Sequence, residues 1–383
     1  MLLSLTPILL LVALLSASVA LFGSDASYGP NQVALVVAAA ATMLVGWWRG
    51  MSWQHIQDGM VSAITVSIMP MMILLSVGAL IGSWIVSGTV PGMIFYGLQL
   101  LNPDIFYAAS AIICALASLS LGSSWTVAGT LGIGLMGIAT TYGLSPAITA
   151  GAIISGAYFG DKLSPLSDTT NLAAAAVGVD LFEHIKNMLW TTLPAFALAL
   201  LFFATIGSEG AAAPDDITRI RAALSDQFAI TPWVLSPLIL MLAMIYFKIP
   251  AYPAILLCTL CGITYGAVFQ AEVVRAMALT AHPESPAPLL QGLWMALFSG
   301  YQSPTGMDQL SQLLDKGGLA SMLNTIFLIL TAMTFGGLLD STGILRQLLD
   351  LVLKGVKRTG DLILATVGSG IITNILAADQ FLA

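Results

Sequence analysis

Long apolar segments constrain this chain more than any other feature of its sequence. A helix needs about 20 apolar residues to cross a lipid bilayer. Only 8% of the 383 residues are charged, whereas a soluble domain has about 25%. Backbone polar groups inside a bilayer must be satisfied within the chain, so the expected fold is an all-α polytopic membrane protein. The segments lie near residues 3–22, 31–48, 60–86, 104–121, 189–207, 230–247, 251–270, 321–340 and 360–377.

The first two segments indicate an orientation. No Lys or Arg precedes residues 3–22 and no clear small-residue cleavage site follows them, so we interpret them as a first span rather than a signal peptide. Arg49 follows the second span, whereas the loop at 23–31 contains no Lys or Arg. Because positive residues favour the cytoplasmic side, we expect the N-terminus in the cytoplasm.

The polar stretch 208–229 is expected to be a surface linker between two membrane repeats, 1–207 and 230–383. The prediction is a pair of inverted repeats with interrupted helices or re-entrant hairpins, an arrangement typical of secondary transporters. The Gly-rich region 122–160 would add either two further passes or one re-entrant hairpin.

Matching positions support the repeat. With an offset of 255, Gly82 falls on Gly337, and the turn Gly122–Trp125 falls on Ala377–Gln380. The second half then stops at Ala383 inside the counterpart of the Gly-rich region. We therefore expect roughly 80 further residues in the whole protein, on the argument that the repeats match in length.

The most unusual polar segment is 161–171. It holds Asp161, Lys162 and Asp168 within an apolar region, although each ionisable group at the bilayer centre costs about 2.5–3.5 kcal/mol. Pro165 removes a backbone hydrogen bond between the two aspartates, which predicts an interrupted helix. Transporters place ion sites at such breaks.

The two carboxylates are the main candidates for ion binding. Carboxylate oxygens suit Na⁺, and a buried carboxyl can exchange a proton for a cation. Lys162 is expected to act as their charge partner rather than as a ligand, since an ammonium repels cations. The structural alternative is a salt bridge of Lys162 with these aspartates. Asp379 ranks third among the acids, whereas Asp340 lies at the end of a span, where a helix-end role is equally expected.

Two clusters of small polar side chains accompany the break. Hydroxyl and amide oxygens can complete a cation shell without adding charge, although an isolated Ser or Thr in a helix normally bonds its own backbone. A Gly156–Gly160 spacing nearby predicts close helix packing. The clusters are Ser123, Ser124, Thr126 and Thr130 after Gly122, and Thr169, Thr170 and Asn171 after Asp168.

These blocks resemble a known signature. GSSWTVAGTLGIGLMGIA followed by GAIISGAYFGDKLSPLSDTTNLAAA is similar to the NhaC sodium/proton antiporter family, and NILAADQFLA resembles that family's second-half turn. The resemblance implies a transporter of the cell (inner) membrane that exchanges internal Na⁺ for external H⁺. Because the family also contains exchangers of malate and lactate, an organic-acid antiporter remains the alternative. The motif residues that the resemblance implies are Asp161, Ser164, Asp168, Thr169, Thr170 and Asn171.

Other functions are less well supported. An intramembrane aspartyl protease would use Asp161 with Asp340 or Asp379, but it leaves the hydroxyl clusters unexplained. We expect no enzyme activity and no cofactor, and with no basic run in a chain of net charge −7 we expect no nucleic acid. Cys258 and Cys261 are interpreted as packing residues in an apolar helix. The expected partners are Na⁺, H⁺ and the bilayer, and a homo-oligomer is compatible with the sequence.

Overall fold

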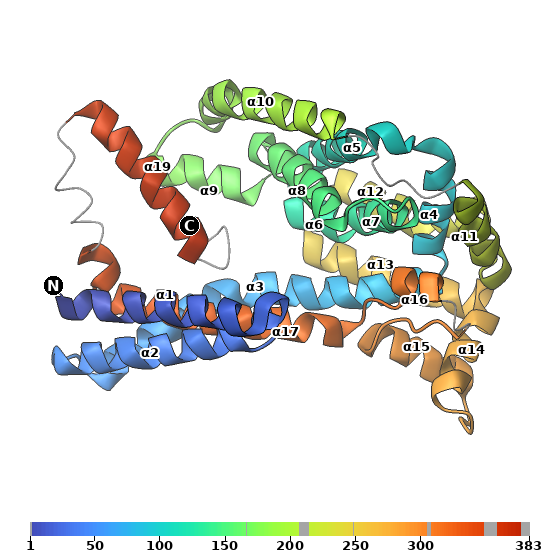
Figure 1. Ribbon diagram of the computed structural model, residues 1–383, viewed down its shortest axis with the longest axis horizontal. Helices are drawn as coiled ribbons and strands as arrows, with labels where there is room; N and C mark the ends of the chain where they lie inside the picture. Colours follow the sequence, from blue (N-terminus) through green and yellow to red (C-terminus); the bar gives the residue numbers. More distant parts are fainter. Residues whose placement is uncertain are drawn as a thin grey trace. The chain divides into compact units, whose positions relative to one another are not determined.

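The computed structural model describes residues 2–165, 167–206, 214–247, 249–304, 308–347 and 358–376, and within these ranges the chain forms only helices and their connections (Figure 1). Six of the described helices are long and apolar enough to cross a membrane, or up to eight if each of two bent helix pairs counts as one span. The expectation of an all-α, multi-pass membrane protein with interrupted helices is therefore confirmed.

The chain divides into two compact units, Met1–Leu74 with Met322–Ala383, and Leu75–Ser321. Helix α3 (Trp53–Val86) contributes its first part to one unit and its second part to the other. We describe each unit by itself.

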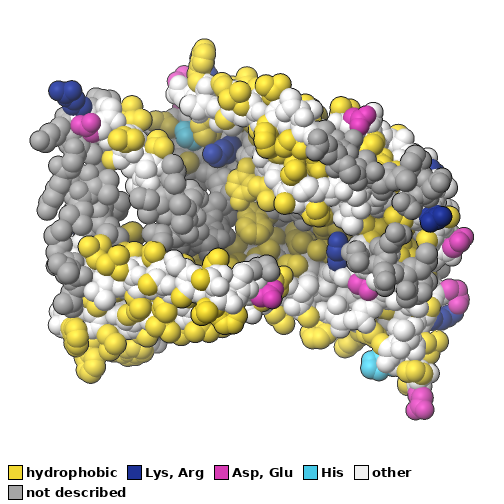
Figure 2. Space-filling view, in the orientation of Figure 1, with side chains coloured by type: hydrophobic (Ala, Val, Ile, Leu, Met, Phe, Trp, Pro, Cys, Tyr) yellow, Lys and Arg dark blue, Asp and Glu magenta, His cyan; other side chains and the backbone are white. Residues whose placement is uncertain are grey.

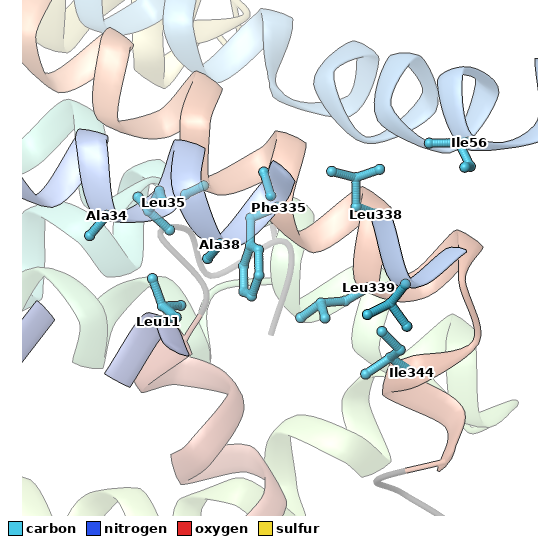
Figure 3. Close-up of a cluster of buried hydrophobic side chains, with 12 residues drawn as sticks. Leu11, Ala34, Leu35, Ala38, Ile56, Phe335, Leu338, Leu339 and Ile344 are labelled. Carbon is cyan, nitrogen blue, oxygen red and sulfur yellow. The ribbon is translucent and has the colours of Figure 1, made fainter. Parts of the chain in front are cut away.

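The first unit has a core of aliphatic side chains. Figure 3 shows Leu11, Ala38, Phe335 and Leu338 within this cluster of buried residues. Small residues let its helices approach closely, since a β-carbon at Gly337 would lie 2.6 Å from the Gly59 carbonyl oxygen. Besides the start of α3, the unit contains α1 (Leu2–Phe22), η1 (Gly23–Ser27), α2 (Pro30–Trp48), α17 (Leu323–Ser341) and α19 (Thr359–Leu376).

The second unit carries the segments expected to bind ions. Much of its surface is apolar, as Figure 2 shows along α10, where Trp190 and Leu198 are exposed. Such a surface suits contact with lipid. After the end of α3, its helices are α4 (Thr89–Leu100), η2 (Pro103–Ile105), α5 (Phe106–Leu121), α6 (Ser124–Gly129), α7 (Leu131–Thr141), α8 (Pro146–Leu163), α9 (Asp168–Val177), α10 (Leu181–Thr205), α11 (Pro214–Gln227), η3 (Pro232–Leu235), α12 (Ser236–Tyr246), α13 (Ala251–Phe269), α14 (Ala271–Ala281), α15 (Pro288–Phe298) and α16 (Asp308–Leu314), and η4 (Leu319–Met322) follows at the junction with the first unit.

Helices α5 and α8 pack against each other more closely than ordinary side chains allow. A β-carbon at Gly156 would lie 2.0 Å from the Ala111 carbonyl oxygen, and one at Gly160 would lie 2.3 Å from that of Ala115. The prediction of close helix packing at the Gly156–Gly160 spacing is confirmed. This contact fixes the end of α8, where Asp161 lies, against α5.

The Gly-rich region and the polar stretch also form helices. Between 122 and 160 the chain forms the short α6 and α7 and then most of α8. Within 208–229, residues 214–227 form α11, whose Arg221 guanidinium lies 5.0 Å from the centre of the Phe95 ring. Cys258 and Cys261 lie within α13 as free thiols, which fits the packing role expected of them.

Candidate functional site

The centre of the site is Asp161, which lies in the last turn of α8 and is only 4% exposed. Its Oδ2 accepts hydrogen bonds from both the hydroxyl and the backbone N–H of Ser124, at 2.7 and 3.2 Å. Ser124 is the buried first residue of α6. The two polar segments selected from the sequence therefore meet through one carboxylate.

A sharp reversal of the chain places Ser124 at this point. Helix α5 ends at Gly122, whose φ of 66° lies in the left-handed region that glycine tolerates. Ser123 then caps α6, since its hydroxyl accepts a hydrogen bond from the Thr126 N–H at 3.3 Å and lies 2.9 Å from the Thr126 hydroxyl. The Ser123 and Thr126 side chains therefore hold the start of α6.

The break between α8 and α9 is tied together by Thr170. Its hydroxyl lies 3.2 Å from the backbone carbonyl oxygen of Asp161 and 3.1 Å from that of Lys162. Carbonyls at the end of a helix have no partner within the helix. Thr170, buried in the first turn of α9, thus satisfies the end of α8 and holds the two half-helices together.

Other side chains of the motif stabilise the connecting loop. Asn171 donates from its amide nitrogen to the carbonyl oxygens of Pro165 and Ser167, at 2.9 and 2.8 Å. The hydroxyls of Ser167 and Thr169 lie 2.9 Å apart, and Ser164 is fully buried. These contacts order the interruption that Pro165 creates.

Of three further predicted site residues, only Lys162 has a side chain in the described structure. Lys162 is exposed, and its ammonium makes no ion pair with Asp161. Asp168 begins α9, but its side chain lies outside the described part. Asp379 lies outside the described residues altogether. Thr130, a fourth member of the hydroxyl cluster, bonds its own backbone at Thr126, as an isolated Thr does.

Two serines near the site were not among the predicted ligands. Ser167 accepts a hydrogen bond from the Thr170 N–H at 3.4 Å, as a helix cap does; a Ser directly before Asp168 is the sequence signal for this role. The Ser118 hydroxyl is buried without a hydrogen-bond partner in the described structure, and Ser118 packs on Gly160 beside Asp161. Nothing local in the sequence distinguishes Ser118 from its neighbours.

This geometry suits exchange of a small cation for a proton. Asp161 receives both described hydrogen bonds on Oδ2, which leaves Oδ1 without a partner among the described residues. Hydrogen bonds to a charged acceptor are short and strong, so Ser124 stabilises the ionised carboxylate. A carboxylate oxygen can hold either Na⁺ or H⁺.

Known proteins resemble this chain over most of its length. The profile of the Na⁺/H⁺ antiporter family matches residues 156–383. The chain is 35% identical over 355 residues to the Na⁺/H⁺ antiporter NhaC of Alkalihalophilus pseudofirmus, which covers 92% of this chain and 73% of that protein.

Two further relatives are antiporters named for organic substrates. The malate-2H⁺/Na⁺-lactate antiporter of Bacillus subtilis is 34% identical over 357 residues, or 92% of this chain and 73% of that protein. The arginine/ornithine antiporter ArcD of Halobacterium salinarum is 32% identical over 394 residues, which cover 99% of this chain and 75% of that protein. The family match and the extent of these similarities show that this chain belongs to the Na⁺/H⁺ antiporter family.

Proposed function

We propose that this protein exchanges Na⁺ for H⁺ across the cell membrane and that Asp161 binds the two ions in turn. The observation that carries the proposal is the buried Asp161 carboxylate, which joins α8 to the start of α6 through Ser124 while one of its oxygens stays without a partner in the described structure. The antiporter relatives support the same chemistry.

Exchange follows from competition at one carboxylate. A proton and a Na⁺ cannot occupy the same oxygen together, so the arrival of one ion favours release of the other. A conformational change that presents the site alternately to each side of the membrane would then couple the two fluxes. We further propose that two inverted repeats, 1–207 and 230–383, supply this movement, and that the N-terminus faces the cytoplasm.

The remaining motif residues have distinct proposed roles. Asp168 is proposed as the second ion-binding carboxylate and Asp379 as a third, while Lys162 would tune the charge of the site. Thr170 and Asn171 are proposed to hold the break in the geometry that the ion requires, since both bond backbone carbonyls there. The protein is proposed to act as a transporter rather than an enzyme.

A test would measure ion exchange directly in vesicles. Purified protein is reconstituted with a pH-sensitive dye inside, and an imposed Na⁺ gradient should drive proton movement. Asp161→Asn keeps the size of the side chain but removes its charge and its titratable proton, so exchange should be abolished. Asp226→Asn, a change at an exposed carboxylate on α11, is the matched control and should leave exchange unchanged.

The same vesicles separate the alternative function. Malate, lactate, arginine and ornithine are added in turn on one side. If an organic ion drives proton or Na⁺ movement while the Na⁺ gradient alone does not, the protein is an organic-ion antiporter and the present proposal is wrong. Exchange at the wild-type rate by Asp161→Asn would likewise remove Asp161 from the mechanism.

A further inference from the structure

The second unit contains a cavity of about 300 Å³ that is separate from the carboxylate site. Its walls come from α3, α4, α6, α7, α8 and α16, and the described residues that line it are aliphatic, glycine or methionine except for one, Lys316. Ile85, Ile94, Ile133, Met136 and Ile153 are typical of these walls. Among the described lining residues, a single positive charge therefore faces an apolar space.

The backbone around Lys316 is firmly held. Its carbonyl oxygen accepts a hydrogen bond from the Tyr301 N–H at 3.1 Å, and its N–H donates to the Leu314 carbonyl oxygen at 2.7 Å. Gly317 follows with a φ of 86°, and a β-carbon there would lie 2.5 Å from the Gly82 nitrogen. The close approach to α3 requires glycine at this position, so Lys316 is kept at the cavity.

The Lys316 ammonium has no compensating anion in the described structure. No ion pair or side-chain hydrogen bond with another described residue involves it, and the neighbouring Asp315 carboxylate instead accepts the Ser303 N–H at 2.6 Å. The side chain keeps access to solvent, but partial burial against the cavity wall lowers the pKa of the ammonium. A cation removed from water without a partner is unfavourable, and an anion would offset that cost.

We propose that this cavity binds a medium-chain aliphatic carboxylate, with the carboxylate on Lys316 and the alkyl chain against the apolar walls. Apart from Lys316, the described lining side chains offer no hydrogen-bond partners for a hydroxy acid, and Lys316 repels an amine. A volume of about 300 Å³ has room for roughly ten groups of the size of a water molecule, which suits an alkyl chain of about ten carbon atoms. The charge of the ligand is thus set by Lys316 and its length by the cavity.

The position of the cavity gives the ligand a means to influence the carboxylate site. Ala128 and Ile153 line the cavity from α6 and α8, the helices that carry Ser124 and Asp161. An alkyl chain between them would hold these two helices in one arrangement. Binding itself does not depend on which ions the protein exchanges.

The experiment uses a decanoate analogue with a photoactivatable diazirine on its alkyl chain. The purified protein in a nonionic detergent is crosslinked, digested and mapped by mass spectrometry. Crosslinks are expected on α7 and α8, and unlabelled decanoate should compete for them. Decanol and decyltrimethylammonium have similar chains without the negative charge and should compete at least about tenfold more weakly, as loss of one charge-assisted contact predicts.

Two variants test whether the charge of Lys316, rather than a general effect on folding, determines the labelling. Lys316→Gln should weaken labelling about tenfold, whereas Lys186→Gln, at an exposed position on α10, should leave it unchanged. Size-exclusion chromatography checks that both variants fold. Equal competition by decanol on the unaltered protein would overturn the proposal without any variant. Labelling confined to lipid-exposed helices such as α10, or unaffected by Lys316→Gln, would overturn it as well.

Discussion

Gly160 lies so close to Ala115 that a β-carbon at position 160 would come within 2.3 Å of the Ala115 carbonyl oxygen. A backbone atom cannot move aside as a flexible side chain can, so the contact between α5 and α8 depends on glycine at this position. Because Asp161 is the next residue, the same contact sets the position of the carboxylate.

Gly160→Ala should therefore destabilise the protein and impair exchange together. Overpacking typically costs about 1–3 kcal/mol, and separation of α8 from α5 would displace Asp161. Gly151→Ala is the matched control on the same helix, since a β-carbon there would meet nothing within 4 Å. Thermal unfolding in detergent and vesicle exchange check both variants. If the two variants had the same stability and the same exchange rate, α5 and α8 would be able to readjust to a β-carbon at position 160.

Ser124→Ala should slow exchange. The change removes the hydroxyl that bonds Asp161 Oδ2 at 2.7 Å and leaves the backbone N–H in place. A hydrogen bond to a charged group contributes about 1.5–3 kcal/mol, so its loss should loosen the contact between α6 and the carboxylate and slow vesicle exchange about tenfold or more. Thr130→Ala removes a hydroxyl that bonds only a backbone carbonyl and should leave the exchange rate unchanged. Exchange at the wild-type rate by Ser124→Ala would contradict the role given to this bond.

Thr170→Val should reduce exchange more than it reduces stability. The substitution keeps the shape of the side chain but removes the hydrogen bonds to the Asp161 and Lys162 carbonyl oxygens. Thr149→Val removes a comparable bond, to the Ser145 carbonyl at the other end of α8. Both variants should lose about 1 kcal/mol of stability, and only Thr170→Val should slow exchange. Similar exchange rates would mean that the contact between α8 and α9 does not shape the ion site.

Lys316→Met should stabilise the protein at neutral pH. Burial lowers the pKa of the Lys316 ammonium below its usual 10.5, so between the lowered value and 10.5 the unfolded chain binds more protons than the folded chain. Stability then rises with pH in that window, and below it the charged form destabilises the fold. The advantage of Lys316→Met should be full at pH 7 and should shrink as the pH approaches 10.5. Thermal unfolding across this range, with Lys186→Met on α10 as the control, checks the prediction. Lower stability of Lys316→Met than of the unaltered protein at pH 7 would contradict it.

Local signals were enough to predict much of the fold. The apolar runs predicted the spanning helices, Pro165 between polar residues predicted the interruption of α8 and α9, and the spacing of Gly156 and Gly160 predicted close packing. Each of these features depends on residues within a few positions of one another. The arrangement of the two repeats and the roles of Asp168 and Asp379 stay predictions.

Contacts between residues far apart in the sequence could not be predicted from such local signals. Ser123 and Ser124 are adjacent and chemically identical, yet only Ser124 reaches Asp161, because the chain reverses at Gly122 and α5 packs on α8. Lys316 follows a short helix and has the local sequence of a solvated surface charge. Its place at an apolar cavity results from the close approach of Gly317 to Gly82.

The described contacts that hold the loop between α8 and α9 are made by neutral groups. Thr170 and Asn171 bond backbone carbonyl oxygens, and none of these contacts involves a charged side chain. Salt screens interactions between charges, so changes in ionic strength should leave this junction intact. The geometry that these contacts give to the end of α8 should therefore be the same at low and at high salt.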